Sequence, residues 1–271
     1  MNSNSIFGHI KTGVTVFYML SAIVLFAQSP QKLKTIPVKA YNVFVNGTDQ
    51  VYILSKGMLE LHLLNGSPVL QYGSKYINKH TKIISVNSFK TILYSEDYGK
   101  IITLDNRLKQ QEIFDIYDLG STVLVSCVGA SLINNTIWIF DAATQKLSKL
   151  DENHKVLFTS NSISQALGKE IHPEQIHEFG IYVYLVDEEN GIYIFDTQGN
   201  YVKYIPIFNA HNFSVVSSKF YYVKDNSAFE YNPLTFTETK FLKTPDLKYL
   251  HFGSSVLAGI NKNNEVEIWT F

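Results

Sequence analysis

The sequence predicts an all-β protein, a six-bladed β-propeller of four-stranded antiparallel blades. Three observations carry this prediction. Short apolar or alternating strands recur along the whole chain, turns centred on Asp or Asn recur about every 40 residues, and the chain ends one strand short of a complete last repeat. Tyr (17) and Phe (18) are abundant among the 271 residues, and both favour half-buried pleated strands.

The repeat is clearest in ENGIYIFDTQGNYVKYIPI (189–207), where an apolar strand, an Asp-centred turn and an alternating strand follow one another. Equivalent turns are centred on Asn65, Asp105, Asp151, Asp196 and Asn232, at spacings of 40, 46, 45 and 36 residues. Asp and Asn suit these positions because their side chains can bond the turn backbone. Two more strands precede each turn, which gives about four strands per unit. A two-domain β protein or sandwich is the alternative, and the regular spacing disfavours it.

The ends of the chain predict how the ring closes. The last unit supplies only three strands, because the chain stops at Phe271 directly after EVEIWT. A spare segment, QKLKTIPVKA (31–40), precedes the first complete unit. We therefore expect the N-terminal strand to complete the C-terminal blade, which removes an exposed sheet edge. Residues 160–180 exceed what a blade link needs, and we expect a connection with a short helical turn there.

The first residues have the layout of a secretory signal peptide. Lys11 is followed by an uncharged run of 16 residues, Thr12 to Ala27, which is shorter than the roughly 20 residues that span a bilayer. We expect cleavage after Ala27, so that residues 1–27 are the signal peptide and 28–271 form a single propeller domain without a membrane span. An uncleaved anchor is the alternative. Export places the protein in the periplasm, at the outer membrane or outside the cell.

Composition excludes several function classes. The formal net charge is −1 and no basic block is present, so we expect no nucleic-acid partner. Cys127 is the single cysteine, which excludes an internal disulfide and a cysteine-rich metal site. The chain contains no G-x-S-x-G elbow, P-loop or H-E-x-x-H motif. We therefore expect no cofactor.

Three stretches carry a family resemblance: YSEDYGKIITLDNRL, NNTIWIFDAATQKLSKLDE and VYLVDEENGIYIFDTQGNYVKYIPI. They resemble a group of uncharacterised, signal-peptide-bearing β-propeller proteins of Bacteroidota, over residues 32–271. The resemblance implies the propeller fold and an envelope or secreted location, and it carries over no catalytic residues. More distantly, the units are similar to NHL and lactonase-like six-bladed propellers. Those folds include enzymes and binding scaffolds, so this analogy does not decide function.

The most polar segment is KEIHPEQIHEFG (169–180). Its two His and three carboxylates are residue types that can hold a divalent metal. The His spacing of five and the intervening Pro173 do not fit a helical zinc site, however, and a solvated loop explains the same composition. The acidic turn DEENG (187–191) is likewise interpreted as solvated. We predict no metal site.

Three residues are predicted to face the central channel: His177, Glu178 and His251. Glu178 in HEFG and His251 in LHFG occupy matching places in units four and six, in the strands expected to be innermost. Titratable groups in a confined channel can bind a ligand or transfer protons. The alternative is a structural role, with hydrogen bonds to channel water and backbone.

These observations predict a non-catalytic binding or scaffold propeller of the bacterial cell envelope, whose partner is another envelope protein. The prediction rests on the signal peptide, the repeat and the lack of a recognisable catalytic set. Crowded tyrosines in unit four are a second indication of a partner surface, because aromatic side chains are enriched at binding hot spots. The alternative function is a ligand- or metal-dependent hydrolase, lactonase-like, that uses the central channel for a small molecule.

Overall fold

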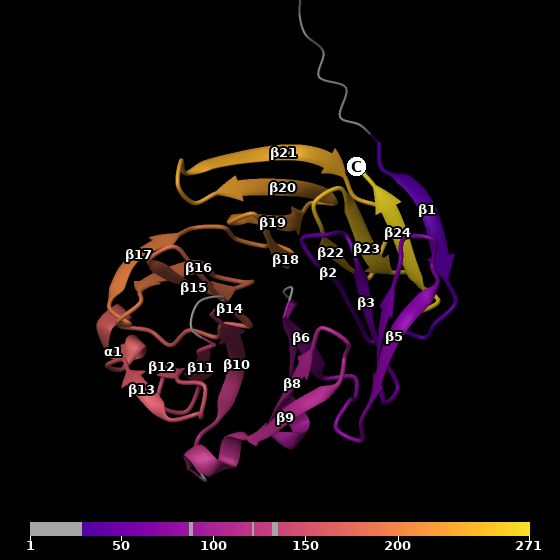
Figure 1. Cartoon of the computed structure of the whole chain (residues 1–271). Helices are drawn as coiled ribbons and strands as arrows, with labels where there is room; N and C mark the ends of the chain where they lie inside the picture. The colour runs from indigo at the N-terminus through magenta and orange to yellow at the C-terminus, as the bar shows by residue number, and fades with distance from the viewer. Residues whose placement is uncertain (1–28, 87–88, 121, 132–134) are drawn as a thin grey trace, which may run out of the picture.

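The computed structural model describes residues 29–271, except for 87–88, 121 and 132–134. The predicted signal peptide therefore lies outside the described residues. Figure 1 shows six four-stranded antiparallel sheets set around a central axis, which confirms the predicted six-bladed propeller. No helix among the described residues is long and apolar enough to cross a membrane.

Blades one to five use four consecutive strands each, with the first strand innermost, and blade six uses β22 to β24 with β1 outermost. Blades one to three contain β2 Asn42–Val45, β3 Val51–Ser55, β4 Met58–His62 and β5 Pro68–Gly73; β6 Thr81–Val86, β7 Lys90–Ser95, β8 Lys100–Asp105 and β9 Gln110–Asp115; and β10 Val125–Ala130, β11 Ile137–Asp141, β12 Lys146–Leu150 and β13 Val156–Thr159. Blades four to six contain β14 Gln175–Phe179, β15 Tyr182–Asp187, β16 Gly191–Asp196 and β17 Tyr201–Ile205; β18 His211–Val216, β19 Lys219–Lys224, β20 Ser227–Asn232 and β21 Thr237–Lys243; and β22 Tyr249–Phe252, β23 Val256–Ile260, β24 Val266–Thr270 and β1 Gln31–Ile36.

The chain ends close the ring as predicted. Strand β1 pairs antiparallel with β24, from Gln31 opposite Thr270 to Ile36 opposite Val266. Ile36 is 4% exposed and belongs to the same core cluster as Val266, so the closing strand is anchored by packing as well as by backbone hydrogen bonds. The first four residues of β1 are exposed.

The repeated Asp and Asn residues bond the turn backbone. Asp105 Oδ1 accepts hydrogen bonds from the backbone N–H groups two and four residues later, at 2.8 and 2.9 Å. Asp151 and Asp196 do the same in the next two blades. In the first and fifth blades, Asn65 and Asn232 accept from the N–H group two residues later. Each side chain thus fixes the turn between the third and fourth strands of its blade, which explains the repeat seen in the sequence.

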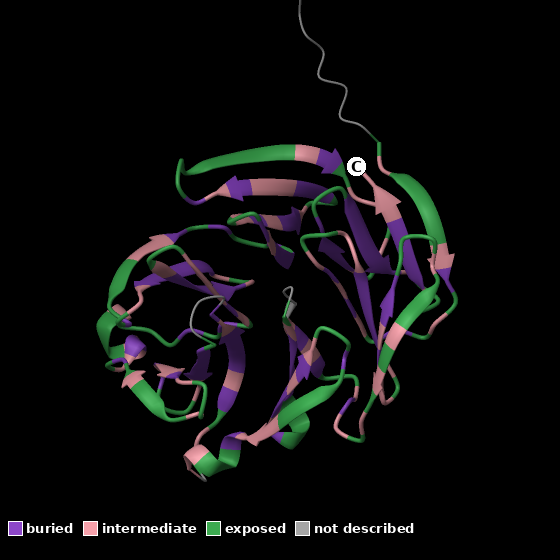
Figure 2. Cartoon of the chain, in the orientation of Figure 1, coloured by how far each residue is buried: buried purple, intermediate pink, exposed green. Residues whose placement is uncertain are grey.

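The apolar core lies between neighbouring blades. Figure 2 shows the inner and middle strands mostly buried, while the exposed strand residues lie mainly on the outermost strands β1, β5, β9, β13, β17 and β21. Where blades three and four meet near the axis, a Cβ at Gly129 would lie 2.6 Å from Ile176, so only glycine permits this approach of β10 to β14. The blades are therefore packed closely enough to fix the inner strands relative to one another.

The long connection between blades three and four contains one short helix, as expected. Helix α1 spans Ile163–Leu167 and ends at Gly168, which has the left-handed φ of 69°. Ile163 is buried, and its N–H donates to Gln145 O at 2.8 Å. The remainder of this connection brings Glu174 to the start of β14, at the axis.

We expect Ile36→Ala to lower the free energy of unfolding by about 2–4 kcal/mol, because it leaves a cavity at the ring closure. The matched control is Leu33→Ala in the same strand. Leu33 is 47% exposed, so its loss should change stability by less than about 0.5 kcal/mol. Urea unfolding followed by tryptophan fluorescence measures both values. Equal effects would show that β1 is not anchored through Ile36.

Candidate functional site

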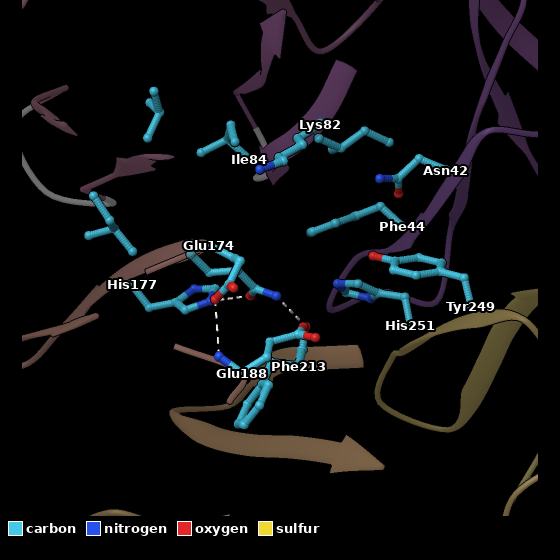
Figure 3. A pocket seen from close by; sticks show the side chains of 14 residues that line it. Asn42, Phe44, Lys82, Ile84, Glu174, His177, Glu188, Phe213, Tyr249 and His251 are labelled. Carbon is cyan, nitrogen blue, oxygen red and sulfur yellow. Dashed lines mark hydrogen bonds between the residues drawn. The ribbon is translucent and has the colours of Figure 1, made fainter. Parts of the chain in front are cut away.

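A cavity of about 240 Å³ lies at the axis, at the end of the channel where the inner strands begin. Figure 3 shows its side chains converging from several blades. The inner strands contribute Asn42 and Phe44 from β2, Lys82 and Ile84 from β6, Val128 from β10, Gln175 and His177 from β14, Phe213 from β18, and Tyr249 and His251 from β22. Two carboxylates come from the connections, Glu174 before β14 and Glu188 after β15.

The strand geometry explains which residues reach the cavity. Side chains alternate between the two faces of a strand, so residues two apart share a face. Gln175 and His177 form such a pair, and so do Tyr249 and His251. Because the strands sit in equivalent blades, both pairs line the same axial cavity.

His251 is held as a neutral imidazole. It is 6% exposed, and its Nδ1 accepts a hydrogen bond from the backbone N–H of Val45 in the neighbouring blade at 3.2 Å. The neutral ring therefore carries its proton on Nε2. Burial lowers the pKa of His251 to about 3, the nearby His177 acts in the same direction, and a backbone hydrogen bond at Phe252 opposes them. The ring also lies against Phe44, with centroids 4.2 Å apart.

His177 is neutral for the same reason. Burial lowers its pKa to about 4. Its Nε2 lies 2.9 Å from the side-chain Oε1 of Gln175, whose amide nitrogen in turn donates to Phe213 O at 3.4 Å. Because the Gln175 oxygen can only accept, Nε2 of His177 is the donor and Nδ1 carries the lone pair.

Two carboxylates of the lining, Glu174 and Glu188, are within electrostatic reach of each other. Glu174 Oε2 accepts a hydrogen bond from the backbone N–H of Glu188 at 3.0 Å. Burial raises the pKa of Glu188 to about 7, the charge of Glu174 adds to the increase, and hydrogen bonds from the backbone of Asn212 and Phe213 together with Lys82 oppose it. The pKa of Glu174 is raised as well, mainly by burial, although this residue is exposed at the rim. Glu188 is half-buried and is therefore the stronger candidate for proton exchange near neutral pH.

Lys82 and Tyr249 complete the polar lining. Lys82 Nζ lies 3.5 Å from Glu96 Oε2, so its charge is shared with a carboxylate of its own blade. Burial raises the pKa of the Tyr249 hydroxyl, and the Glu188 charge raises it further, which keeps this hydroxyl protonated. The cavity thus combines neutral hydrogen-bonding groups, a carboxylate pair and apolar walls.

The structure places Glu178 in a different environment from the two histidines. Its Oε1 accepts from the Ser131 hydroxyl at 2.8 Å, and its Oε2 accepts from the indole N–H of Trp138 and lies 3.2 Å from Lys149 Nζ. The ammonium group of Lys149 lies 4.9 Å from the centre of the Trp138 ring. Glu178 therefore ties blade four to blade three rather than lining the axial cavity.

A one-residue shift explains this difference. In blade four, Phe179 pairs with Tyr182 and Gly180 lies in the turn. In blade six, Gly253 itself pairs, since its N–H donates to Val256 O at 2.7 Å. Aligned on the pairing, His177 is equivalent to His251, and Glu178 points to the opposite face. The shared Phe-Gly sequence predicts the wrong equivalence.

Several cavity residues were not singled out by the sequence. The sequence pattern assigns Glu188 to a solvated turn, and Lys82, Phe44 and Tyr249 belong to no motif. Alignment of the inner strands on their hairpins, combined with the two-residue period, would have found the pairs in β2, β6, β14 and β22. Nothing in the sequence near Glu188 shows that its turn reaches the axis.

Among the residues that the structure describes, no cluster of three or more His, Cys, Asp or Glu is placed to hold a metal ion. His251 packs against Phe44 and His177 is bonded to the Gln175 amide, and Figure 3 shows the two imidazoles on opposite sides of the cavity rather than gathered on one point. The arrangement instead suits a small molecule with an apolar part and polar groups, which is the general composition of ligand pockets.

Comparisons with known proteins agree with the fold. No family model and no curated protein matches the sequence. Among solved structures, a streptogramin B lyase superposes with a TM-score of 0.58 and 11% identity, over 90% of this chain and 86% of that one. BBS1N in its complex with ARL6DN superposes with a TM-score of 0.54 and 10% identity, over 85% of this chain and 77% of that one. PorZ, a surface component of the type-IX secretion system of Porphyromonas gingivalis, superposes with a TM-score of 0.53 and 11% identity, over 81% of this chain and 29% of PorZ. At these identities the similarity is one of fold.

The carboxylate of Glu188 should make stability depend on pH. Its native pKa of about 7 lies above the ordinary value of 4.5, so the native state binds more protons than the unfolded state between these pH values, and stability falls as pH rises through them. Glu188→Gln removes this loss of stability, because the glutamine side chain does not ionise. After discounting for solvent screening, we expect the variant to gain about 1–2 kcal/mol relative to the parent protein between pH 4.5 and 8.

Urea unfolding across this pH range measures the effect. Glu189→Gln is the matched control, because Glu189 is the exposed neighbour in the same turn and does not line the cavity. Its stability should follow that of the parent protein at every pH. Parallel curves for all three proteins would contradict the assigned protonation of Glu188.

Proposed function

We propose that this chain is a binding propeller and that its axial cavity is the ligand site. The observation that carries the proposal is convergence: the inner strands of all six blades contribute to one cavity of about 240 Å³. A ligand there would contact every blade at once. Its binding would use positions that the closed ring holds fixed, so little ordering of the protein would be required.

The chemistry of the cavity favours binding over catalysis. Both imidazoles are neutral, and with pKa values of about 4 and 3 they are weak bases at neutral pH. His177 is bonded through Nε2 to Gln175, and His251 accepts from the Val45 backbone, so each ring is fixed in one orientation. Fixed neutral donors and acceptors are well suited to recognising a ligand.

The second candidate is an acid–base hydrolase that uses the same cavity. One observation favours it: burial raises the pKa of Glu188 to about 7, near the value at which a carboxylate is most effective in proton transfer. Hydrolysis by this route needs a water molecule activated by Glu188. The metal-dependent version has no support from the described residues, since none of their clusters suits a metal.

We also propose an envelope location and a protein partner. Support for the location comes from the layout of residues 1–27 and from the fold shared with PorZ, a bacterial surface component. Support for the partner comes from Tyr117 and Leu124, which are 56% and 61% exposed beside a second cavity of about 200 Å³ between blades two and three. BBS1N, another propeller of similar shape, is seen in complex with ARL6DN.

The location has a direct test. Expressed with a C-terminal tag in a bacterium that exports proteins, the chain should appear outside the cytoplasm with the intact mass of a polypeptide that begins at Gln28. Ala27→Arg should block cleavage, because the cleavage site requires a small residue, and should leave the longer chain. Recovery of the full-length chain from the cytoplasm alone would contradict the export proposal.

The ligand site is tested by filling it. Ile84 lines the cavity, and we expect Ile84→Trp to abolish the binding of small molecules that a fragment screen by ligand-observed NMR identifies with the parent protein. Ile181→Trp is the control, because Ile181 is 69% exposed in the β14–β15 turn and lies outside the cavity. Both variants should keep the circular dichroism of the parent. Fragments that bind all three proteins equally would contradict the axial site.

A further inference from the structure

The axial cavity is chemically two-sided. Glu174 and Glu188 lie together, joined by the hydrogen bond from the Glu188 backbone to the Glu174 carboxylate. Figure 3 shows Phe44 and Tyr249 reaching toward the cavity from the side opposite Glu174. A molecule in the cavity would therefore meet the Glu174 carboxylate on one side and aromatic rings on the other, with Glu188 within electrostatic reach of both Glu174 and Tyr249.

The lining carries more negative than positive charge. Lys82 is the one cation among the lining residues, and it lies 3.5 Å from Glu96, outside the cavity. The two imidazoles add no positive charge, because burial keeps them neutral. The buried Asp187 lies beside Glu188 in the chain and adds a further carboxylate near the pair. Lys82 acts on both Glu174 and Glu188, but its charge is shared with Glu96, so this single cation does not balance the two carboxylates of the lining.

The aromatic side also favours positive charge. Aromatic rings attract cations through the negative potential of their faces, and this attraction strengthens where water is excluded. Phe44 is backed by the His251 ring, with centroids 4.2 Å apart, which fixes its position. The Tyr249 hydroxyl stays protonated, since its pKa is raised by burial and by Glu188.

Building on the proposed ligand site, we propose that the axial cavity binds a small organic cation, a protonated or quaternary amine with a short apolar body. The ammonium group lies between the carboxylates of Glu188 and Glu174 and the rings of Phe44 and Tyr249, and the carbon atoms bonded to its nitrogen contact these rings. Neutral His177 and His251 flank the ligand without opposing its charge.

Binding of such a cation is coupled to the proton on Glu188. The groups that face Glu188 are Glu174 from the preceding connection, Lys82 from β6, His177 from β14, and Tyr249 and His251 from β22. Burial raises the pKa of Glu188 to about 7, so its charge changes near neutral pH. The cation prefers the ionised carboxylate, so affinity rises with pH, by about tenfold between pH 6 and pH 8.

Isothermal titration calorimetry with choline and with 3,3-dimethylbutanol tests the proposal. The alcohol replaces the quaternary nitrogen by carbon and so matches choline in shape without its charge. We expect choline to bind about tenfold or more tightly than the alcohol at pH 8 and to lose about tenfold in affinity at pH 6, while the alcohol shows no pH dependence.

Two variants assign the effect to the site. Glu188→Gln keeps the shape of the side chain and should lower choline affinity at pH 8 by about tenfold and remove its pH dependence. Glu189→Gln alters the exposed neighbour and should behave as the parent protein does. Choline binding that survives unchanged in Glu188→Gln would overturn the proposal.

The remaining outcomes separate this inference from the ligand site itself. If the alcohol binds as well as choline, and Ile84→Trp abolishes both, the cation proposal is overturned while the axial ligand site stands. If neither choline nor the alcohol binds, but Ile84→Trp abolishes the binding of other fragments, the cation proposal is again overturned and the axial ligand site stands. If no molecule distinguishes Ile84→Trp from the parent protein, both proposals fall.

Discussion

The pairing of β1 with β24 is the constraint on which the rest of the structure depends. The last sheet is complete only when β24 receives a neighbouring strand, and here that strand comes from the opposite end of the chain. Closure sets the position of every blade relative to the axis. The inner strands of blades six and one then lie close enough for Val45 to donate to His251. A cavity residue is thus oriented by the closure itself.

The axial cavity shows how packing changes the chemistry of ordinary side chains. Histidines on a surface titrate near pH 6.5, whereas burial at the axis holds His177 and His251 neutral. Burial acts on Glu188 in the opposite sense and keeps its proton to about pH 7, because it disfavours whichever form is charged. Both effects follow from one cause, the burial of these side chains in the axial cavity.

The position of Glu178 shows that similar repeat sequences do not by themselves determine which face of a strand a side chain occupies. HEFG and LHFG look equivalent, yet a shift of one residue in pairing moves Glu178 to the opposite face of its strand. There it joins Trp138, Lys149 and Ser131 and holds two blades together. The strand was predictable from its composition. The direction of the side chain was not, because it depends on where the following turn begins.

The sequence by itself determined the blade count, the turn positions and the closing strand. These features are local: Asp105 and its equivalents bond N–H groups two and four residues away, and a missing fourth strand can be counted. Only the tertiary structure decided which residues share the axis. Glu174, Glu188, Lys82 and Tyr249 come from segments far apart in the chain, and no local pattern records their approach. Their protonation and charge balance follow from that approach, because electrostatic interactions depend on distance and burial rather than on position in the sequence.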